Sequence, residues 1–428
     1  MRRIGSRGVL AVVVGTAAAV TAACGSNGSD NQKAASAASG PVTLTWWHNG
    51  TSDPLKGVWQ GVADSYHAAH PKVTIKVQPI QNEQFTTKVP LALQSNDPPE
   101  VYQQWGGGQE ATQVQSGKLM DLTPLTQSWI RQIGPAAAGW QVNGRQYGVP
   151  FDLHVVGFLY RKDLFQKAGI DQPPKTMADL DADVAKLKQS GVAPIAIGSK
   201  DRWPDAFWWE YFAVRECPTS VLKSSMKAQQ LSDPCFTKAG NDTQAFLATK
   251  PFQTGFLGTP AQQGAGSTAG IVANGKAAME LQGDWEPSTM APLTSDKQLS
   301  SKLGWFPFPT VPGGKGDPNV ALGGGDGFSC TTKGTAACAD FLRYIDSPSV
   351  QKKLVASGAA SLPANPAAAS AIKIPAVKDV LDYSKNASYI QTYFDIALPT
   401  APGQALDDAV ADFFAGQGSA DSVPKSVQ

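Results

Sequence analysis

The sequence has few of the side chains that bind metal ions. Its 428 residues include four histidines and five cysteines. His48, His67, His70 and His154 do not have the spacing of a metal site as a set. His67 and His70 stand three residues apart, but the solvated end of a helix before Pro71 explains them better than a metal pair does. We therefore expect neither a metal ion nor another cofactor.

Charged residues are also scarce, at 17%, and the two signs almost cancel. Lys and Arg total 36 and Asp and Glu total 35, a formal net charge of +1. Arg2, Arg3 and Arg7 fall in an N-terminal segment that we expect to be removed, which leaves 33 basic against 35 acidic residues, a net charge of −2. Proteins that bind nucleic acid or anionic membranes need a strong basic excess. We therefore expect no nucleic-acid partner.

Several motifs of enzyme chemistry are missing from the sequence. It contains no G-x-G-x-x-G, no HExxH and no G-x-S-x-G. Residues 270–277 nearly match a phosphate loop, but Ala277 replaces the Ser or Thr that would hold magnesium. Paired carboxylates for glycoside hydrolysis need only be close in space. A secreted glycoside-active enzyme therefore remains an alternative.

No apolar run is long enough to cross a bilayer, which needs about 20 residues. The run at 9–20 is about a dozen residues long and follows three arginines, which is typical of a secretory signal peptide, here 1–23. Cys24 ends an Ala-Ala-Cys that resembles a bacterial lipobox, although Thr21 stands where that pattern prefers Leu. An ordinary cleaved signal is the alternative. Residues 24–40 are rich in Gly, Ser, Asn and Ala, and we expect them to be a flexible tether.

Four cysteines remain in the body of the chain. An even number in an exported protein is typical of disulfides. Four cysteines allow three pairings, and the shortest loops join Cys217 to Cys235 and Cys330 to Cys338. A metal site is the alternative, but no C-x-x-C and no neighbouring histidine supports it. We predict these two disulfides.

Predicted strands and helices alternate along the chain. Residues 42–47 and 73–77 have the β-branched or alternating pattern of strands, and apolar residues at helical spacing lie between them. Further strands are predicted at 100–102, 155–160, 192–197, 277–281, 304–308 and 320–322, and further helices at 85–93, 162–168, 177–189, 205–216, 336–345, 349–356 and 406–414. This alternation is typical of an α/β fold with parallel strands. The length suggests two or three folding units of roughly 150 residues.

Three segments of the chain carry motifs that occur together in order. The first is Thr-Leu-Thr-Trp-Trp at 43–47. The second comprises Tyr-Gly-Val-Pro-Phe-Asp at 147–152 and Leu-Tyr-Arg-Lys-Asp-Leu-Phe at 159–165. The third comprises Gly-Lys-Ala-Ala-Met at 275–279 and Gly-Asp-Trp at 283–285. With these motifs the chain resembles, over essentially all of 41–428, the extracellular solute-binding proteins (family 1) of bacterial carbohydrate ABC transporters, in particular maltose-binding-protein-like lipoproteins of the actinobacterial type.

The resemblance implies a two-lobe periplasmic-binding-protein fold of the type II-like kind, with a ligand cleft between lobes joined by hinge strands. It assigns 41–151 and 308–360 to the N-terminal lobe. It assigns 152–307 and 361–428 to the C-terminal lobe. The chain would cross from one lobe to the other near 151 and 307. Pro150 and the prolines and glycines between 307 and 314 are consistent in composition with such crossings.

The remaining chemistry suits a sugar, which has apolar C–H faces and a rim of hydroxyls. Tryptophan rings cover such faces, and Asp, Glu, Asn and Gln side chains bind the hydroxyls. We expect most of the eleven tryptophans to be core residues, including Trp46, Trp59, Trp203 and Trp305. Because ligands of α/β sheets lie beyond the carboxyl ends of strands, the candidates are the residues that follow predicted strands.

The candidate ligand-binding residues come from strand ends, the predicted crossing and one aromatic helix. They are Trp47, His48, Asn49, Glu83, Gln104, Trp105, Asp152, His154, Trp208, Trp209, Asp284, Trp285 and Asp326. Trp208 and Trp209 share a helix crowded with aromatic residues, so we expect only one of them to reach the cleft. The glycines around Asp326, at 323–325 and 327, would let the backbone approach a ligand closely.

We predict a non-enzymatic lipoprotein, anchored outside the cell membrane, that delivers a neutral sugar or small oligosaccharide to ABC permease subunits. A xylo-oligosaccharide is one candidate ligand, and we expect a monomer. A peptide or amino-acid carrier is a further alternative, but the predicted strand ends offer no Arg to pair with a carboxylate. Arg202, beside Trp203, is the exception.

Overall fold

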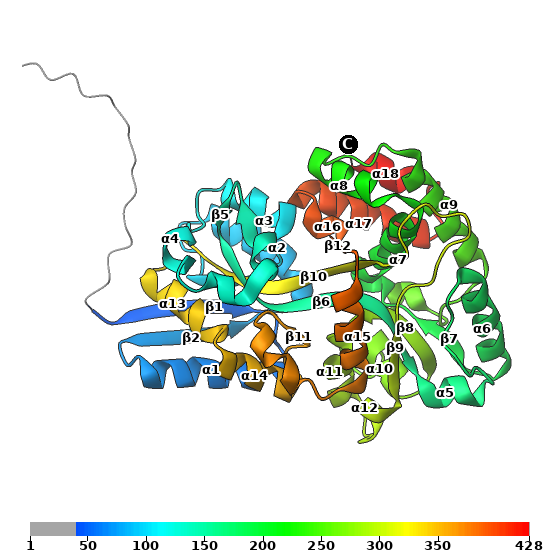
Figure 1. Ribbon diagram of the computed structural model, residues 1–428, viewed down its shortest axis with the longest axis horizontal. Helices are drawn as coiled ribbons and strands as arrows, with labels where there is room; N and C mark the ends of the chain where they lie inside the picture. Colours follow the sequence, from blue (N-terminus) through cyan, green and yellow to red (C-terminus); the bar gives the residue numbers. More distant parts are fainter. Residues whose placement is uncertain (1–39, 428) are drawn as a thin grey trace, which may run out of the picture. The chain divides into compact units, whose positions relative to one another are not determined.

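The structure is a computed structural model that describes residues 40–427. The predicted signal peptide 1–23, the predicted lipid site Cys24 and the predicted tether up to residue 39 lie outside the described residues. From residue 40 to 427 the chain forms a mixed α/β fold around a ten-stranded sheet (Figure 1). No helix in this part of the chain combines the length and the apolar character that a membrane span requires.

The first three long strands are parallel, as the alternation of strand and helix predicts. β1 (Val42–His48) pairs with both β2 (Val73–Pro79) and β3 (Val101–Gln104). α1 (Leu55–Ala69) and α2 (Asn82–Gln94) form the two crossovers, and α1 buries Trp59, Val62, Ala63 and Tyr66 at helical spacing. The buried residues of β1 alternate, so that Trp46 lies in the core as predicted.

Two long antiparallel strands connect the two parts of the sheet. β6 (Gly148–Arg161) pairs with β10 (Val320–Cys330) through its first half and with β8 (Ala277–Gly283) and β9 (Leu303–Phe306) through its second half. In Figure 1 both strands extend between the part that contains β1 and β2 and the part that contains β7 and β8, and they run in opposite directions.

Both strands are longer than the sequence pattern predicts. The glycines at 323–327 were expected to follow a strand that ends at 322, but they lie inside β10, where pairing with β6 keeps them extended. The space beside Gly324 is filled by the ring of Tyr393, and the space beside Gly325 and Gly327 by Trp140. These glycines therefore accommodate aromatic rings of the chain itself.

The second part of the sheet contains the parallel pair β7 (Ala193–Ala196) and β8, while β12 (Tyr389–Thr392) runs parallel to β10. α7 (Trp203–Glu216) is buried along almost its whole length. Trp208 is stacked on Phe246, and Trp209 is stacked on Phe236. A helix surrounded by apolar neighbours is a core helix.

The other elements cover the sheet or connect its strands. They are α3 (Gly107–Val114), α4 (Thr123–Thr126), α5 (Lys162–Lys167), α6 (Met177–Gln189), α8 (Thr219–Ala228), α9 (Pro234–Ala248), α10 (Thr268–Ala273), α11 (Glu286–Met290), α12 (Leu299–Lys302), α13 (Ala336–Ile345), α14 (Pro348–Ser357), α15 (Pro375–Asn386), α16 (Phe394–Ala397), α17 (Thr400–Phe414), α18 (Ser422–Ser426), the 3-10 helices Ile130–Trp140, Ser199–Asp201, Phe256–Gly258, Ala291–Leu293 and Pro366–Ala371, and the short strands β4 (Gln141–Val142), β5 (Arg145–Gln146) and β11 (Leu362–Pro363). The sequence pattern does not predict α8, α9, α15 or β12.

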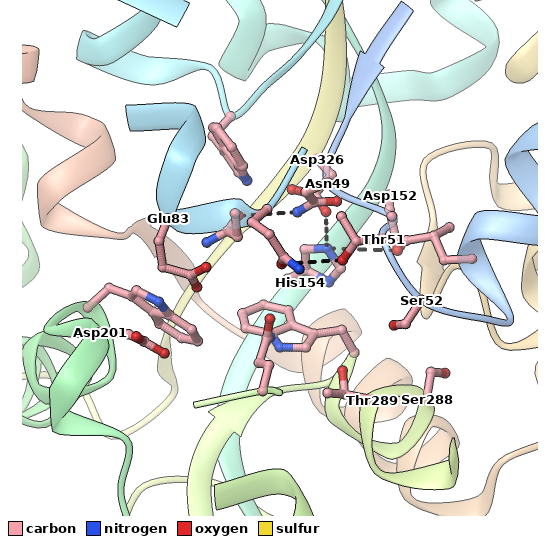
Figure 2. A pocket seen from close by; sticks show the side chains of 18 of the residues that line it. Asn49, Thr51, Ser52, Glu83, Asp152, His154, Asp201, Ser288, Thr289 and Asp326 are labelled. Atoms are coloured by element: carbon pink, nitrogen blue, oxygen red, sulfur yellow. Dashed lines mark hydrogen bonds and ion pairs between the residues drawn. The ribbon is translucent and has the colours of Figure 1, made fainter. Parts of the chain in front are cut away.

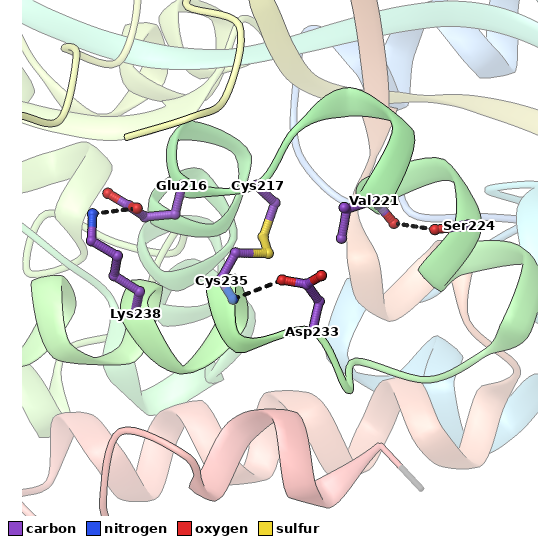
Figure 3. Close-up of a disulfide and its surroundings, with 7 residues drawn as sticks. All are labelled: Glu216, Cys217, Val221, Ser224, Asp233, Cys235 and Lys238. Atoms are coloured by element: carbon purple, nitrogen blue, oxygen red, sulfur yellow. Dashed lines mark hydrogen bonds and ion pairs between the residues drawn. A yellow bond between two sulfur atoms is a disulfide. The ribbon is translucent and has the colours of Figure 1, made fainter. Parts of the chain in front are cut away.

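Both predicted disulfides are confirmed. Cys217, after α7, is bonded to Cys235 in α9, and Cys330, at the end of β10, is bonded to Cys338 in α13. Around the first disulfide, the Asp233 carboxylate accepts a hydrogen bond from the Cys235 N–H at 2.9 Å (Figure 3). This disulfide ties together two helices that pack on each other.

Replacing both Cys217 and Cys235 by Ala should lower the free energy of unfolding by about 2–4 kcal/mol, because the unfolded chain loses a closed loop. Urea denaturation at neutral pH measures the loss. The Cys330→Ala/Cys338→Ala variant is the matched control. It should lose less, because its loop spans 8 residues instead of 18. Equal stability of the first variant and the parent would contradict the expectation.

Candidate functional site

A cavity of about 350 Å³ opens where the strand ends of both parts of the sheet meet. Its lining combines polar side chains with aromatic rings. The lining residues include Asn49, Asp53, Asn82, Glu83, Trp105, Asp152, His154, Asp201, Arg202, Trp203, Phe207, Trp285, Asp326, Ser361, Tyr393, Asp395 and Asp407. Figure 2 shows how the polar groups and the tryptophan rings face the same space.

The first wall of the cavity follows from the parallel arrangement of β1, β2 and β3. Their carboxyl ends lie at one edge of the sheet, where Asn49, Asn82 and Trp105 follow the three strands. The Asn49 side-chain amide donates to the Asn82 side-chain oxygen at 3.2 Å. The Asn49 N–H donates to the Gln103 side-chain oxygen at 2.9 Å. These bonds orient the polar rim before any ligand binds.

Aromatic rings form the opposite wall. The ring of Trp285 follows β8 and lies edge-to-face with His154, with centroids 4.8 Å apart. A Cβ atom on Gly283 would lie 2.0 Å from the Trp285 ring, so that only glycine leaves room for this ring. Trp203 and Phe207 stand on α7, and Tyr393 follows β12. Four aromatic side chains from three different strand ends thus share one wall.

A buried histidine and two aspartates, Asp152 and Asp326, line the centre of the cavity, and a third aspartate, Asp284, lies directly behind them. The register of β6 and β10 sets Asp152 opposite Asp326. His154 Nδ1 lies 3.1 Å from Asp284 Oδ1, and His154 Nε2 lies 3.4 Å from Asp326 Oδ2 and 3.8 Å from Asp152 Oδ2. The Asp152 carboxylate also accepts a hydrogen bond from the Ser361 N–H at 3.0 Å.

The charges in this cluster shift the pKa values of its members. Burial lowers the pKa of His154, but the carboxylates of Asp152 and Asp284 and the hydrogen bonds to Asp284 and Asp326 outweigh it and raise the pKa well above its ordinary value. Burial raises the pKa of Asp152 well above its ordinary value, although the charge of His154 opposes this shift. The surrounding carboxylates therefore favour a protonated His154.

Seven of the thirteen predicted residues line the cavity, and Asp284 lies directly behind it, bonded to His154. The seven are Asn49, Glu83, Trp105, Asp152, His154, Trp285 and Asp326. Asn49, Glu83, Trp105 and Trp285 lie beyond strand ends, as the strand-end rule predicts. Asp152 and His154, predicted from the crossing, and Asp326 lie instead within β6 and β10.

The structure does not bring the other five predicted residues to the cavity lining. Trp47 and His48 lie inside β1, which is longer than predicted, and the Trp47 indole N–H donates to Gln78 at 2.6 Å. Burial lowers the pKa of His48 to about 3 and keeps its ring neutral. The buried Gln104 amide donates to the Gln113 side chain at 2.6 Å.

Trp208 and Trp209 are the remaining two, and neither reaches the cavity. Both are fully enclosed by aromatic neighbours in the core, at 1% and 0% exposure. Trp203, which the sequence pattern assigned to the core, lines the cavity instead. Trp203 begins α7 and follows β7 after the short 3-10 helix Ser199–Asp201. It therefore lies in the connection beyond a strand end, where the strand-end rule looks for ligand-binding residues.

Other lining residues were missed because their strand was not predicted. Tyr393 and Asp395 follow β12, whose four residues carry little apolar alternation. Asp407 lies in α17, and no sequence pattern marks it as part of a site. Arg202, the one arginine noted from the sequence, does line the cavity and forms an ion pair with Asp408.

Among residues 40–427, no group of three or more His, Cys, Asp and Glu side chains is arranged to hold a metal ion. The lining instead offers hydrogen-bonding groups and ring faces. A cavity of this kind, built from preformed strand ends and flat aromatic surfaces, defines a protein that holds a small polar molecule.

Sequence comparison shows the family to which the chain belongs. Residues 50–352 match the family "Bacterial extracellular solute-binding protein", and the chain belongs to this family. The chain is similar to an ABC transporter extracellular-binding protein of Pyrococcus horikoshii, with 27% identity over 252 residues that cover 56% of this chain and 54% of the relative. It thus matches only about half the length of this relative. It is also 27% identical over 315 residues to the diacetylchitobiose binding protein DasA of Streptomyces coelicolor, covering 71% of this chain and 69% of the relative.

Comparison with solved structures agrees with this family assignment. A structure described under xylan utilization by the thermophilic bacterium Caldanaerobius polysaccharolyticus superposes with a TM-score of 0.82 and 25% identity, covering 90% of this chain and 99% of that one. The chain therefore has the two-lobe α/β fold of solute-binding proteins that the sequence predicts.

Replacing His154 by Gln should lower the free energy of unfolding by roughly 3–5 kcal/mol at pH 6, because the buried carboxylates lose their countercharge. The folded-state pKa of His154 lies above the unfolded value of about 6.5. Its contribution is therefore complete below about pH 6.5 and is lost as the pH rises through the folded-state pKa. The difference between parent and variant should shrink from pH 6 to pH 9 in urea denaturation.

The control is His67→Gln on the exposed face of α1, which should cost much less at either pH. A loss for His154→Gln that stays constant with pH would show that the histidine is not charged in the folded protein.

Proposed function

We propose that this protein captures a sugar or small oligosaccharide outside the cytoplasm and delivers it to the permease subunits of an ABC importer. The observation that carries the proposal is the cavity itself. Trp105 and Trp285 offer ring faces to C–H surfaces, and Asn49, Glu83 and Asp326 offer directed hydrogen-bonding groups. The relative that is named as a diacetylchitobiose binding protein supports a saccharide ligand.

We further propose the lobe boundaries at 41–151 with 308–360 and at 152–307 with 361–428. β6 changes its pairing partners from β10 to β8 near residue 156, which supports a crossing close to this position. Lobes joined by such strands can close over a ligand, and the closed form would be what the permease recognises. Asp152 and His154 would then lie at the hinge.

We also propose a location and an oligomeric state for the protein. Signal cleavage after residue 23, a lipid on Cys24 and a tether to residue 40 would hold a monomer at the outer face of the cell membrane. The protein would bind no nucleic acid and need no cofactor. Its action would be binding without turnover, as the names of its relatives suggest.

Isothermal calorimetry with a panel of di- and trisaccharides, including xylobiose, cellobiose and maltose, tests the proposal. At least one saccharide should bind saturably, and chromogenic glycosides of the same sugar should not be hydrolysed. Hydrolysis at a useful rate would establish the alternative, a glycoside-active enzyme. Absence of binding across the panel would refute the proposed function.

Trp105→Ala and Trp285→Ala should each weaken saccharide binding by about 1 kcal/mol or more, which is roughly fivefold in Kd, because each removes a ring face from the cavity. Calorimetry with the saccharide found above measures the change.

Trp47→Phe is the matched control, because Trp47 lies outside the cavity lining and contacts Gln78. Its Kd should match that of the parent. Unchanged affinity in both alanine variants would show that the ligand binds elsewhere.

A further inference from the structure

The cavity has a strong excess of acidic side chains. Seven of its lining residues carry carboxyl groups, whereas Arg202 and His154 are its basic lining residues. The seven are Asp53, Glu83, Asp152, Asp201, Asp326, Asp395 and Asp407. Arg202 is paired with Asp408, and His154 is enclosed by Asp152, Asp284 and Asp326. Both basic groups are therefore already paired with carboxylates of the chain, and the cavity lining keeps an excess of negative charge.

The excess is greatest in one corner, where Asp395 and Asp407 line the cavity and Glu210 lies behind them. Glu210 is fully buried, and one of its oxygens accepts a hydrogen bond from the Phe394 N–H at 2.8 Å. The other oxygen of Glu210 and Oδ1 of Asp407 have no hydrogen-bond partner. Unpaired buried carboxylate oxygens are costly unless a ligand or a proton satisfies them.

The three carboxyl groups also act on one another. Burial raises the pKa of Asp395 to about 6 and that of Asp407 well above its ordinary value. The charges of Asp395 and Glu210 raise the pKa of Asp407 further, as do those of Asp408 and Asp205. The neighbouring charges that act on Asp407 most strongly are thus all negative, and a positive group is what the corner lacks.

Aromatic rings complete this corner. Tyr393 and Phe207 lie with ring centroids 5.2 Å apart, and Phe207 and Trp285 with centroids 6.5 Å apart. Tyr393 is only 6% exposed, and its hydroxyl has no hydrogen-bond partner although it lines the cavity. The negative faces of such rings attract cations, and aromatic rings combined with carboxylates suit an ammonium group.

We infer that the ligand is a sugar or oligosaccharide that carries a protonated amino group, which binds between Asp395, Asp407 and the ring of Tyr393. This inference rests on the proposed function and changes the neutral ligand expected from the sequence into a cationic one. An ammonium group donates up to three hydrogen bonds and supplies the missing positive charge. A hydroxyl in the same place satisfies the hydrogen bonds but leaves the charges of the carboxylates unopposed.

Three β-1,4-linked disaccharides test the inference, because they differ only at C2: the glucosamine disaccharide with free amines, cellobiose with hydroxyls, and N,N′-diacetylchitobiose with neutral amides. Calorimetry on the purified protein at about pH 7 and low salt should show the glucosamine disaccharide binding at least tenfold more tightly than cellobiose. The ratio should fall at 0.5 M NaCl, because salt screens the attraction.

Asp395→Asn and Asp407→Asn keep the shape of the corner and remove one charge each. Each variant should reduce the affinity for the glucosamine disaccharide at least five times more than the affinity for cellobiose. Asp382→Asn is the control, since Asp382 lies on α15, outside the cavity lining, and pairs with Lys385 at 3.0 Å. It should change neither affinity, and the thermal melting of all variants should confirm that they fold.

Three outcomes would overturn the inference: equal binding of the amine and hydroxyl disaccharides, equal losses for both ligands in the Asn variants, and no binding of any of the three disaccharides. If neutral saccharides of the wider panel still bind, the proposed function stands without the inference. If no saccharide binds at all, the proposed function fails as well.

Discussion

The antiparallel pairing of β6 with β10 is the constraint on which the rest of the site depends. Its register places Asp152 opposite Asp326 and brings His154 within reach of both. The second half of β6 pairs with β8, whose end carries Asp284 and Trp285 to the same point. A histidine and three aspartates can be buried together only because each finds a partner or a proton there. The same two strands connect the two parts of the sheet, so that the centre of the cavity is also the proposed hinge.

Glycines in the strands around the cavity make room for its aromatic wall. In β10 and at the end of β8, glycines leave space for aromatic rings of the chain: Tyr393 beside Gly324 and Trp285 beside Gly283. These rings form the wall of the cavity on which a sugar ring or a cation would lie. Tight packing in the sheet and the shape of the ligand site therefore depend on the same missing side chains. The acidic excess is confined to the cavity, because the chain is close to neutral overall while the charged residues of the cavity lining are mostly acidic.

Much of the fold follows from simple rules, and about half of the residues predicted from the sequence line the cavity. The alternation of strands and helices predicts the parallel strands β1, β2 and β3, and the position after each strand locates Asn49, Glu83 and Trp105. The rule fails where a strand lacks an apolar pattern, as in β12, and Tyr393 and Asp395 are missed as a result. Sequence periodicity also does not show which side chains of a helix meet a cavity: Trp203 and Phe207 of α7 line it, whereas Trp208 and Trp209 of the same helix are enclosed in the core.

The family resemblance, the class of fold and the preference for the two short-loop disulfides can be inferred without the structure. Local patterns suffice for these, because strand periodicity and loop length are properties of neighbouring residues. Which polar groups meet in the cavity is visible only in the folded chain. Asp152 and Asp326, or Glu210 and Asp407, are far apart along the chain, and their proximity depends on strand register and helix packing. The charge that a ligand encounters is therefore a property of the folded cavity, and the net charge of the chain does not reveal it.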